Sequence, residues 1–371
     1  MSPMLMLTRN ISAETVLCKC CPDSKLRVPE LGYNICEKRK GIVPKTLELL
    51  LKKRLKYKRL RHEVNDEKLR KVYNLRQEAL KWILVTCFGY LGYRNARFGK
   101  VDAHIAVCAF AREALLKTAK MAEERGFKII HGIVDSLCIR KAGATPREVA
   151  EFCREVSREI RIPLNVEGKY RWIVFLPSKV LGDVPVLNRY YGVFEDGRIK
   201  VRGLEARRRD TPPFIAEAQM KILKELAKAK NAEEFKERIP SALKQLRNYA
   251  EALIQRKVPP QKLLIKKQLS HQPSKYTHDV FQAIAAKQLA RLGVDVSAGQ
   301  TVQYLIADAE NRRVYNRITV AQLVNSNTKY DVEKYLELLF SAAENILLPF
   351  GYSAQKIRDY VLHGEKQVAL K

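Results

Sequence analysis

A long helical pattern near the start of the sequence constrains the fold more than any other feature. It begins at Pro44, and its leucines recur at helical spacing among many cations. Residues 63–66 (Glu-Val-Asn-Asp) indicate a turn, and a second helical pattern runs from about Glu67 to Cys87. We therefore expect an antiparallel helical hairpin with a strongly basic face. The leucines of the first stripe are Leu47, Leu50, Leu51, Leu55 and Leu60.

The charge of the whole chain is also strongly positive. Its 371 residues include 69 Lys and Arg against 40 Asp and Glu, a formal net charge of +29. Such an excess favours a polyanionic partner, with nucleic acid ahead of an anionic membrane. The longest apolar runs are about seven residues, too short for a transmembrane span or a secretory signal. We expect a cytoplasmic, nucleoid-associated protein without membrane contact.

The remaining patterns predict helices mixed with antiparallel strands. Apolar content is 46%, enough for a sizeable core. Alternating strand–helix units are absent, so the fold class is α+β rather than a doubly wound sheet. Residues 1–43 look irregular. Further helices are expected over 101–125, 145–160, 211–257 with a break at Pro240, and near 330–348. Strands are expected over 128–133, 137–139, 164–167, 171–175, 190–194 and 199–203.

Six segments resemble motifs of archaeal-type family B DNA polymerases and occur in that family's order. Residues 76–93 resemble the fingers motif, and residues 127–136 resemble the palm motif Tyr-Gly-Asp-Thr-Asp-Ser. Residues 164–168 are similar to a palm strand with Glu before Gly, and 188–192 to the Lys-Lys-Arg-Tyr-Ala box. Residues 202–210 match the segment before the thumb. Residues 258–263 and 330–335 fit the thumb itself.

This resemblance implies a domain organisation. It predicts a segment leading into the palm (1–43), helical-hairpin fingers (44–88), an antiparallel-sheet palm with flanking helices (89–210) and a mostly helical thumb (211–371). Ser2-Pro3-Met4 resembles the tail of the first palm motif, so that motif's aspartate would precede Met1. We expect a diverged or split form without the N-terminal domain, the editing exonuclease and that aspartate.

The resemblance also implies a two-metal site for nucleotidyl transfer. Two Mg²⁺ ions need carboxylates from separate backbone segments. Asp135 matches the second aspartate of the palm motif and lies near the tip of an expected hairpin, and Glu167 is a possible accessory ligand. Ile133 replaces the motif's first aspartate and cannot bind a metal, which lowers the expected activity. The alternative is that Asp135 is only a turn residue and Glu167 only an exposed strand residue.

Three cations match the family's triphosphate-binding positions. Arg54 and Lys58 share a face of the first helix, and the turn brings Lys81 to roughly the same level. Phe88 replaces the motif's Tyr and can stack under a nucleotide, whereas Val85 replaces its Asn. The alternatives are a solvated basic face for the cations and core packing for Phe88.

The resemblance assigns DNA contacts that carry no sequence code. Duplex DNA is held mainly through its phosphates. The alternative is a scattered basic surface. The expected DNA-binding residues are Gly89, Tyr90, Arg189, Tyr190, Tyr191, Arg208, Arg209 and Lys267.

Four of the eight cysteines cluster early in the chain: Cys18, Cys20, Cys21 and Cys36. Four thiolates can bind zinc, but Cys-x-Cys-Cys matches the paired Cys-x₂-Cys pattern of zinc sites poorly, so zinc is disfavoured. Some heat-adapted archaeal relatives carry a disulfide in this region, which implies a bond from Cys20 or Cys21 to Cys36. Free buried thiols are the third alternative.

Two functions of different classes follow. The first is one subunit of a split polymerase that extends primers with dNTPs, where a larger subunit carries the N-terminal, exonuclease and first palm motif regions. The second is a catalytically inactive DNA-binding subunit in replication or repair, which Ile133 favours. Arg54, Lys58 and Lys81 favour the first, because a chain that only binds DNA needs no triphosphate site. A misassigned start of the reading frame remains a third alternative.

Overall fold

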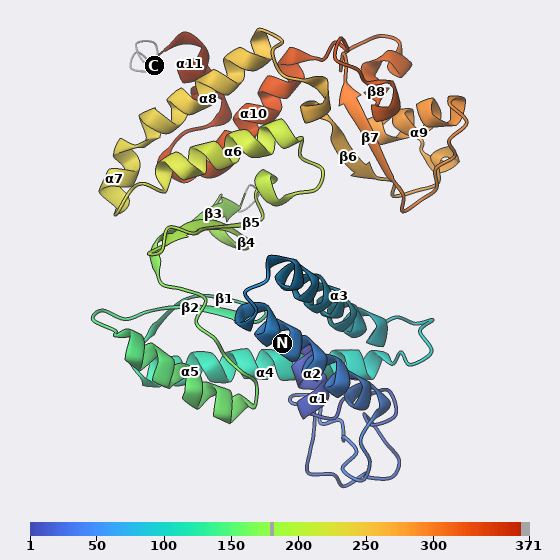
Figure 1. Cartoon of the computed structure of the whole chain (residues 1–371), viewed down its shortest axis with the longest axis vertical. Helices are drawn as coiled ribbons and strands as arrows, with labels where there is room; N and C mark the ends of the chain where they lie inside the picture. Colours follow the sequence, from blue (N-terminus) through green and yellow to red (C-terminus); the bar gives the residue numbers. More distant parts are fainter. Residues whose placement is uncertain (179–181, 365–371) are drawn as a thin grey trace. The chain divides into compact units, whose positions relative to one another are not determined.

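The computed structural model describes residues 1–178 and 182–364, which divide into two compact units, Met1–Glu167 and the chain from Gly168 onward (Figure 1). Helices dominate both units, and every strand pair among the described residues is antiparallel. The expected α+β class is therefore confirmed. No helix in the described ranges is long and apolar enough to cross a membrane.

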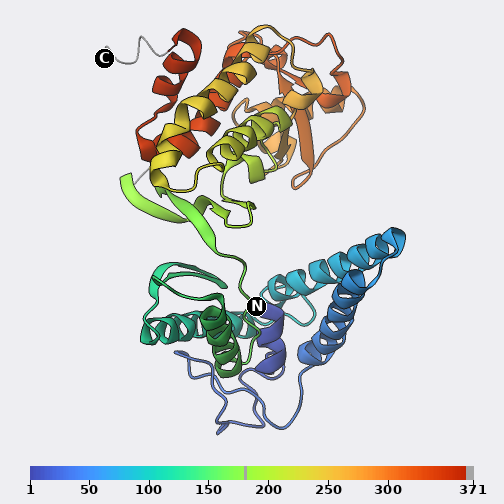
Figure 2. The ribbon, with the colours of Figure 1, turned by 60° about the vertical axis from the view of Figure 1, so that its left-hand side comes forward.

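The first unit contains the expected helical hairpin, which projects from the rest of that unit (Figure 2). Asp66 begins the second helix, since its carboxylate accepts hydrogen bonds from the backbone N–H groups of Lys68 (2.7 Å) and Leu69 (3.3 Å). The helices of this unit are α1 (Ser2–Thr8), α2 (Ile42–Glu63), α3 (Glu67–Leu91), α4 (Val101–Glu124) and α5 (Pro146–Ile160).

A β-hairpin completes the first unit. Strands β1 (Lys128–Ile133) and β2 (Ser136–Arg140) pair so that Ile133 lies opposite Ser136, which leaves a two-residue turn. Helix α4 packs against both strands of the hairpin and against α5, and the rings of Phe127 and Phe152 lie 5.5 Å apart in the shared core. This core holds the hairpin and its turn in place.

The second unit places helices beside two three-stranded sheets. One sheet has the order β3 (Tyr170–Ser178), β4 (Gly182–Phe194), β5 (Ile199–Arg202), and the other has β6 (Ile265–Gln268), β7 (Thr301–Ile306), β8 (Ile318–Val320). The helices are α6 (Pro213–Leu226), α7 (Ala232–Glu237), α8 (Ile239–Ile254), α9 (Phe281–Arg291), α10 (Val332–Leu347) and α11 (Ala354–His363). Short 3₁₀ segments connect several of them.

Three sequence-based expectations about local structure were wrong. Residues 164–167 form no strand, because the backbone N–H of Leu164 donates to Ser157 Oγ (2.8 Å) instead of to a neighbouring strand. The expected helix over 211–257 does break next to Pro240, where α8 begins, but it also breaks after α6, and Asn231 caps α7 by accepting from the Glu234 N–H (2.8 Å). Residues 2–8 are helical rather than irregular, with Pro3 in the first turn.

Candidate functional site

Asp135 lies in the turn between β1 and β2. Its side chain is 57% exposed, and its Oδ2 lies 3.9 Å from the α-amino group of Met1. The preceding turn residue, Val134, has φ = 51°, a left-handed conformation that a β-branched residue rarely adopts. The paired strands therefore present one carboxylate to solvent at the tip of a rigid hairpin, with local backbone strain beside it.

Glu167 lies near the boundary of the first unit. It is exposed and lies outside any strand, at the end of the first unit. Its role as an accessory carboxylate stays a prediction. Ile133, the neighbour of the turn, offers no ligand atom, so the hairpin tip contributes a single carboxylate to any metal site.

Arg54 is the expected triphosphate ligand with the most distinctive environment. It is half-buried on α2, and its Nε finds no hydrogen-bond partner among the described residues. A buried guanidinium nitrogen without a partner costs free energy, which an anionic ligand would recover. Because this nitrogen is itself buried, the binding of a triphosphate by Arg54 stays a prediction.

The relative level of the three expected cations on the hairpin stays a prediction. Tyr57 of α2 stacks on Tyr73 of α3 with ring centroids 6.0 Å apart, and Arg61 donates to Asn74 Oδ1 (2.8 Å), so side chains of the two helices meet along the hairpin. Lys58 and Lys81 are exposed, and Lys58 lies nearer the turn than Arg54.

Phe88 combines an exposed edge with a packed face. Its ring stacks on His104 of α4, with centroids 4.2 Å apart and planes 21° apart, and the His104 Nδ1 lies 3.1 Å from the Phe88 carbonyl oxygen. Gly89 follows, and a Cβ added there would meet no atom within 4 Å, so the fold itself does not require glycine. The Tyr90 side chain is exposed. These residues form a surface on the last turns of α3 that is open to a ligand.

The expectation that Tyr191 contacts DNA was wrong. Its side chain is 0% exposed, and its hydroxyl donates to the carbonyl oxygen of Ile346 (2.8 Å). Burial raises the pKa of this phenol well above its ordinary value. Tyr190 is only 6% exposed and packs beside Phe175. Both tyrosines are buried in the second unit.

Arg189 is oriented by a buried polar network that sequence reasoning missed. Its Nη2 donates to Asn345 Oδ1 (2.9 Å), and Asn345 Nδ2 donates to Glu205 Oε1 (2.7 Å). Gln219 Nε2 donates to the other oxygen of Glu205 (2.7 Å). The network fixes the Arg189 guanidinium from one side.

Two expected DNA-binding cations share one carboxylate. Arg208 Nη2 and Lys267 Nζ donate to Asp210 Oδ2, over 2.8 Å and 3.0 Å, whereas Arg209 is exposed. The hydrogen bonds from Arg208 hold the pKa of Asp210 well below its ordinary value; partial burial opposes this effect, and Lys267 adds to it. Asp210 thus reduces the positive charge that Arg208 and Lys267 offer to DNA, and Arg209 keeps its full charge.

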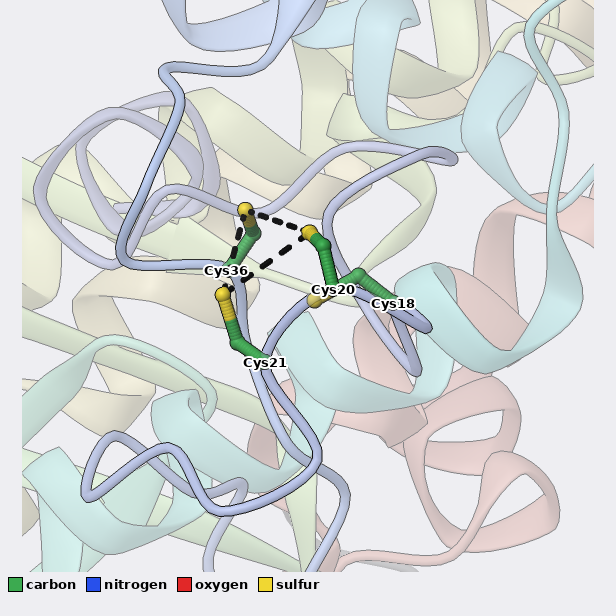
Figure 3. A group of neighbouring side chains, drawn as sticks. All are labelled: Cys18, Cys20, Cys21 and Cys36. Atoms are coloured by element: carbon green, nitrogen blue, oxygen red, sulfur yellow. Dashed lines mark hydrogen bonds between the residues drawn. The ribbon is translucent and has the colours of Figure 1, made fainter.

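The early cysteines do gather in space (Figure 3). No disulfide joins them in the described structure, since the shortest Sγ–Sγ distance, Cys20 to Cys36, is 3.5 Å. Burial favours the neutral thiol of Cys36, but hydrogen bonds from the backbone of Arg39 and Lys38 and from Cys20 lower its pKa to about 7.

Comparisons with known proteins agree with the motif order. The sequence model of DNA polymerase family B matches residues 2–350. The DNA polymerase of Thermococcus sp. (strain 9oN-7) is 29% identical over 364 residues, which cover 96% of this chain and 45% of that protein. DNA polymerase 2 of Saccharolobus solfataricus is 34% identical over 236 residues, or 64% of this chain and 33% of that protein. The solved family B DNA polymerase from Pyrobaculum calidifontis matches with a TM-score of 0.59 and 28% identity, covering 95% of this chain and 44% of that one. This chain thus spans less than half the length of these relatives.

Proposed function

Because the chain belongs to DNA polymerase family B, we propose that it is the fingers, palm and thumb part of a DNA-directed DNA polymerase. It would extend a primer 3′-OH by template-directed nucleotidyl transfer of dNTPs. In this proposal residues 1–43 lead into the palm, 44–88 are the fingers, 89–210 the palm and 211–371 the thumb. The observation that carries the proposal is Asp135, a solvent-facing carboxylate held on a hairpin turn.

The donor set of this chain fits part of a magnesium site. Asp135 supplies a hard oxygen ligand and Glu167 a second one, while Ile133 supplies none. Asp135 and Glu167 would hold Mg²⁺, which when bound would activate the attacking hydroxyl and neutralise charge on the leaving phosphates. The chain's own residues do the rest: Arg54 and Lys81 bind the triphosphate, and Phe88 stacks on the nucleotide.

We infer that the upstream palm aspartate comes from a second, larger polypeptide with the N-terminal and exonuclease regions. The start of α1 is where that aspartate would lie. The α-amino group of Met1 lies 3.9 Å from Asp135, so a carboxylate brought to the start of α1 would lie beside Asp135. Such a pair would come from two backbone segments, as a two-metal site requires.

A primer-extension assay with Mg²⁺ and dNTPs tests both the polymerase activity and the source of the upstream aspartate. We expect this chain alone to bind primer–template and extend it poorly, and the complex with the larger polypeptide to extend it well. Robust extension by the chain alone would refute the need for an outside aspartate. An inactive complex that still binds DNA would support the second candidate, a DNA-binding subunit without chemistry, which Ile133 favours.

A further inference from the structure

The cysteine cluster has the dimensions of a tetrahedral metal site. The Sγ atoms of Cys18, Cys20, Cys21 and Cys36 all lie within 4.8 Å of one another. The Sγ–Sγ distances are 3.5 Å for Cys20–Cys36, 3.8 Å for Cys21–Cys36 and 3.8 Å for Cys20–Cys21 (Figure 3). Four sulfurs each about 2.3 Å from one zinc ion are about 3.8 Å apart. The three distances among Cys20, Cys21 and Cys36 therefore match the edges of a zinc tetrahedron.

The backbone around the cluster is built to hold these four residues. Asn34 Nδ2 donates to the carbonyl oxygens of Cys18 (2.9 Å) and Cys21 (2.7 Å), which fixes both cysteines. Leu17 has φ = 54°, so the chain turns sharply just before Cys18. Cys18, Cys21 and Cys36 are buried, and Cys20 is exposed. This turn lets the Cys-x-Cys-Cys segment direct three sulfurs to one point, which its spacing alone did not indicate.

The segment between α1 and α2 needs such a cross-link. Residues 9–41 contain no helix or paired strand, only the isolated bridges Val16–Ile35 and Arg27–Asn34. Ordered segments of this length without secondary structure are uncommon. The cysteines form their own small core there, separate from the main core of the first unit. A bound ion would add a cross-link to the backbone hydrogen bonds that already join Leu17 to Asn34 and Cys36 to Thr15.

We propose that Cys18, Cys20, Cys21 and Cys36 bind one zinc ion in a closed, structural site that fixes the loop between α1 and α2. Zinc suits four thiolates without an open position. An iron–sulfur cubane occupies the space between its cysteines and needs the sulfurs farther apart than they are here. The proposal does not depend on polymerase activity.

Metal analysis of the full chain tests the proposal. We would express it in zinc-containing medium, purify it under reducing conditions without chelator and measure its metals by mass spectrometry. We expect about one zinc per chain and a fall in melting temperature when a chelator removes it. Cobalt exchanged into the site should give the absorption of tetrahedral thiolate coordination. Any one of three results would overturn the proposal: a chain that contains no zinc, a disulfide that links a cysteine peptide to Cys36, or bound iron together with sulfide.

Matched substitutions locate the ion. Cys36→Ser should reduce the bound zinc at least tenfold, whereas Cys108→Ser, at an exposed cysteine of α4, should leave about one zinc per chain. Equal zinc contents in the two variants would refute the assignment. If Cys36→Ser fails to fold, the cobalt spectrum of the unchanged chain still decides between the outcomes.

Discussion

The α-amino group of Met1 lies 3.9 Å from the carboxylate of Asp135, so the start of the first helix meets the tip of the β1–β2 hairpin. These residues lie far apart in the sequence, and the core of the first unit brings them together. In the proposed function, this contact marks the place where a second carboxylate would complete a metal site. It also makes Asp135 the residue whose substitution tests the proposed function most directly.

Asp135→Asn should lower primer extension by the assembled complex roughly 10²-fold or more, because it removes the negative charge of the carboxylate that is proposed to bind Mg²⁺. Binding of primer–template, measured by fluorescence anisotropy, should stay unchanged. Asp196→Asn is the matched control, since Asp196 also lies in an exposed turn between two strands. Equal extension by the two variants would remove Asp135 from the site.

Val134→Asn should stabilise the first unit by about 1 kcal/mol, because asparagine tolerates the left-handed conformation that strains valine. Calorimetry should show the transition of that unit rise by roughly 2–4 °C. Val166→Asn, at an exposed loop residue without positive φ, should give no rise. A loss of stability in Val134→Asn would show that the turn carries no strain.

Arg54→Gln and Lys81→Gln should each raise the KM for dNTP roughly tenfold in the assembled complex, because each removes a charge-assisted phosphate contact. Lys58→Gln should have a smaller effect, since Lys58 lies nearer the turn of the hairpin. The control is Lys53→Gln, at an exposed neighbour of Arg54. If all four variants match the unchanged protein, the fingers assignment is wrong.

Asn345→Ala should destabilise the second unit by about 1–3 kcal/mol, because it removes the hydrogen bonds of a buried amide to Arg189 and to one oxygen of Glu205. Urea unfolding followed by circular dichroism measures the loss. Gln355→Ala removes an exposed hydrogen bond to Asp359 and should change the free energy of unfolding little. If the two variants have similar free energies of unfolding, the network adds no stability.

Asp210→Asn should lower stability at neutral pH by on the order of 1 kcal/mol, a modest value because water screens the exposed Arg208 and Lys267. The folded-state pKa of Asp210 lies below the ordinary value of 3.8, so this stability is fully present above about pH 4 and is lost as the pH falls toward the folded value. Melting temperatures of the two proteins should therefore converge below pH 4. The control, Asp295→Asn at an exposed residue, should show no such difference in melting temperature at any pH. A difference for Asp210→Asn that stays the same at every pH would contradict the link between the Asp210 pKa and stability.

The sequence alone determined the features that depend on neighbouring residues. The leucine stripe and the Asp66 cap specify the α2–α3 hairpin, because helical spacing and capping act within a few residues. Thr145 caps α5 in the same local way, by accepting from the Glu148 N–H (3.2 Å). The turn at Asp135 also follows from two short apolar runs with three residues, 134–136, between them. The motif order then indicated the family, which the comparisons confirmed.

The tertiary structure decided which side chains face inward and which distant residues meet. Tyr191 is buried because α10 offers it the Ile346 carbonyl oxygen, a partner far away in the sequence. Arg189 meets Asn345 for the same reason. The spacing of Cys18, Cys20 and Cys21 argued against a metal, yet the turn at Leu17 and the hydrogen bonds of Asn34 bring their sulfurs to Cys36. Such contacts depend on how separate elements pack, and a local pattern does not contain that information.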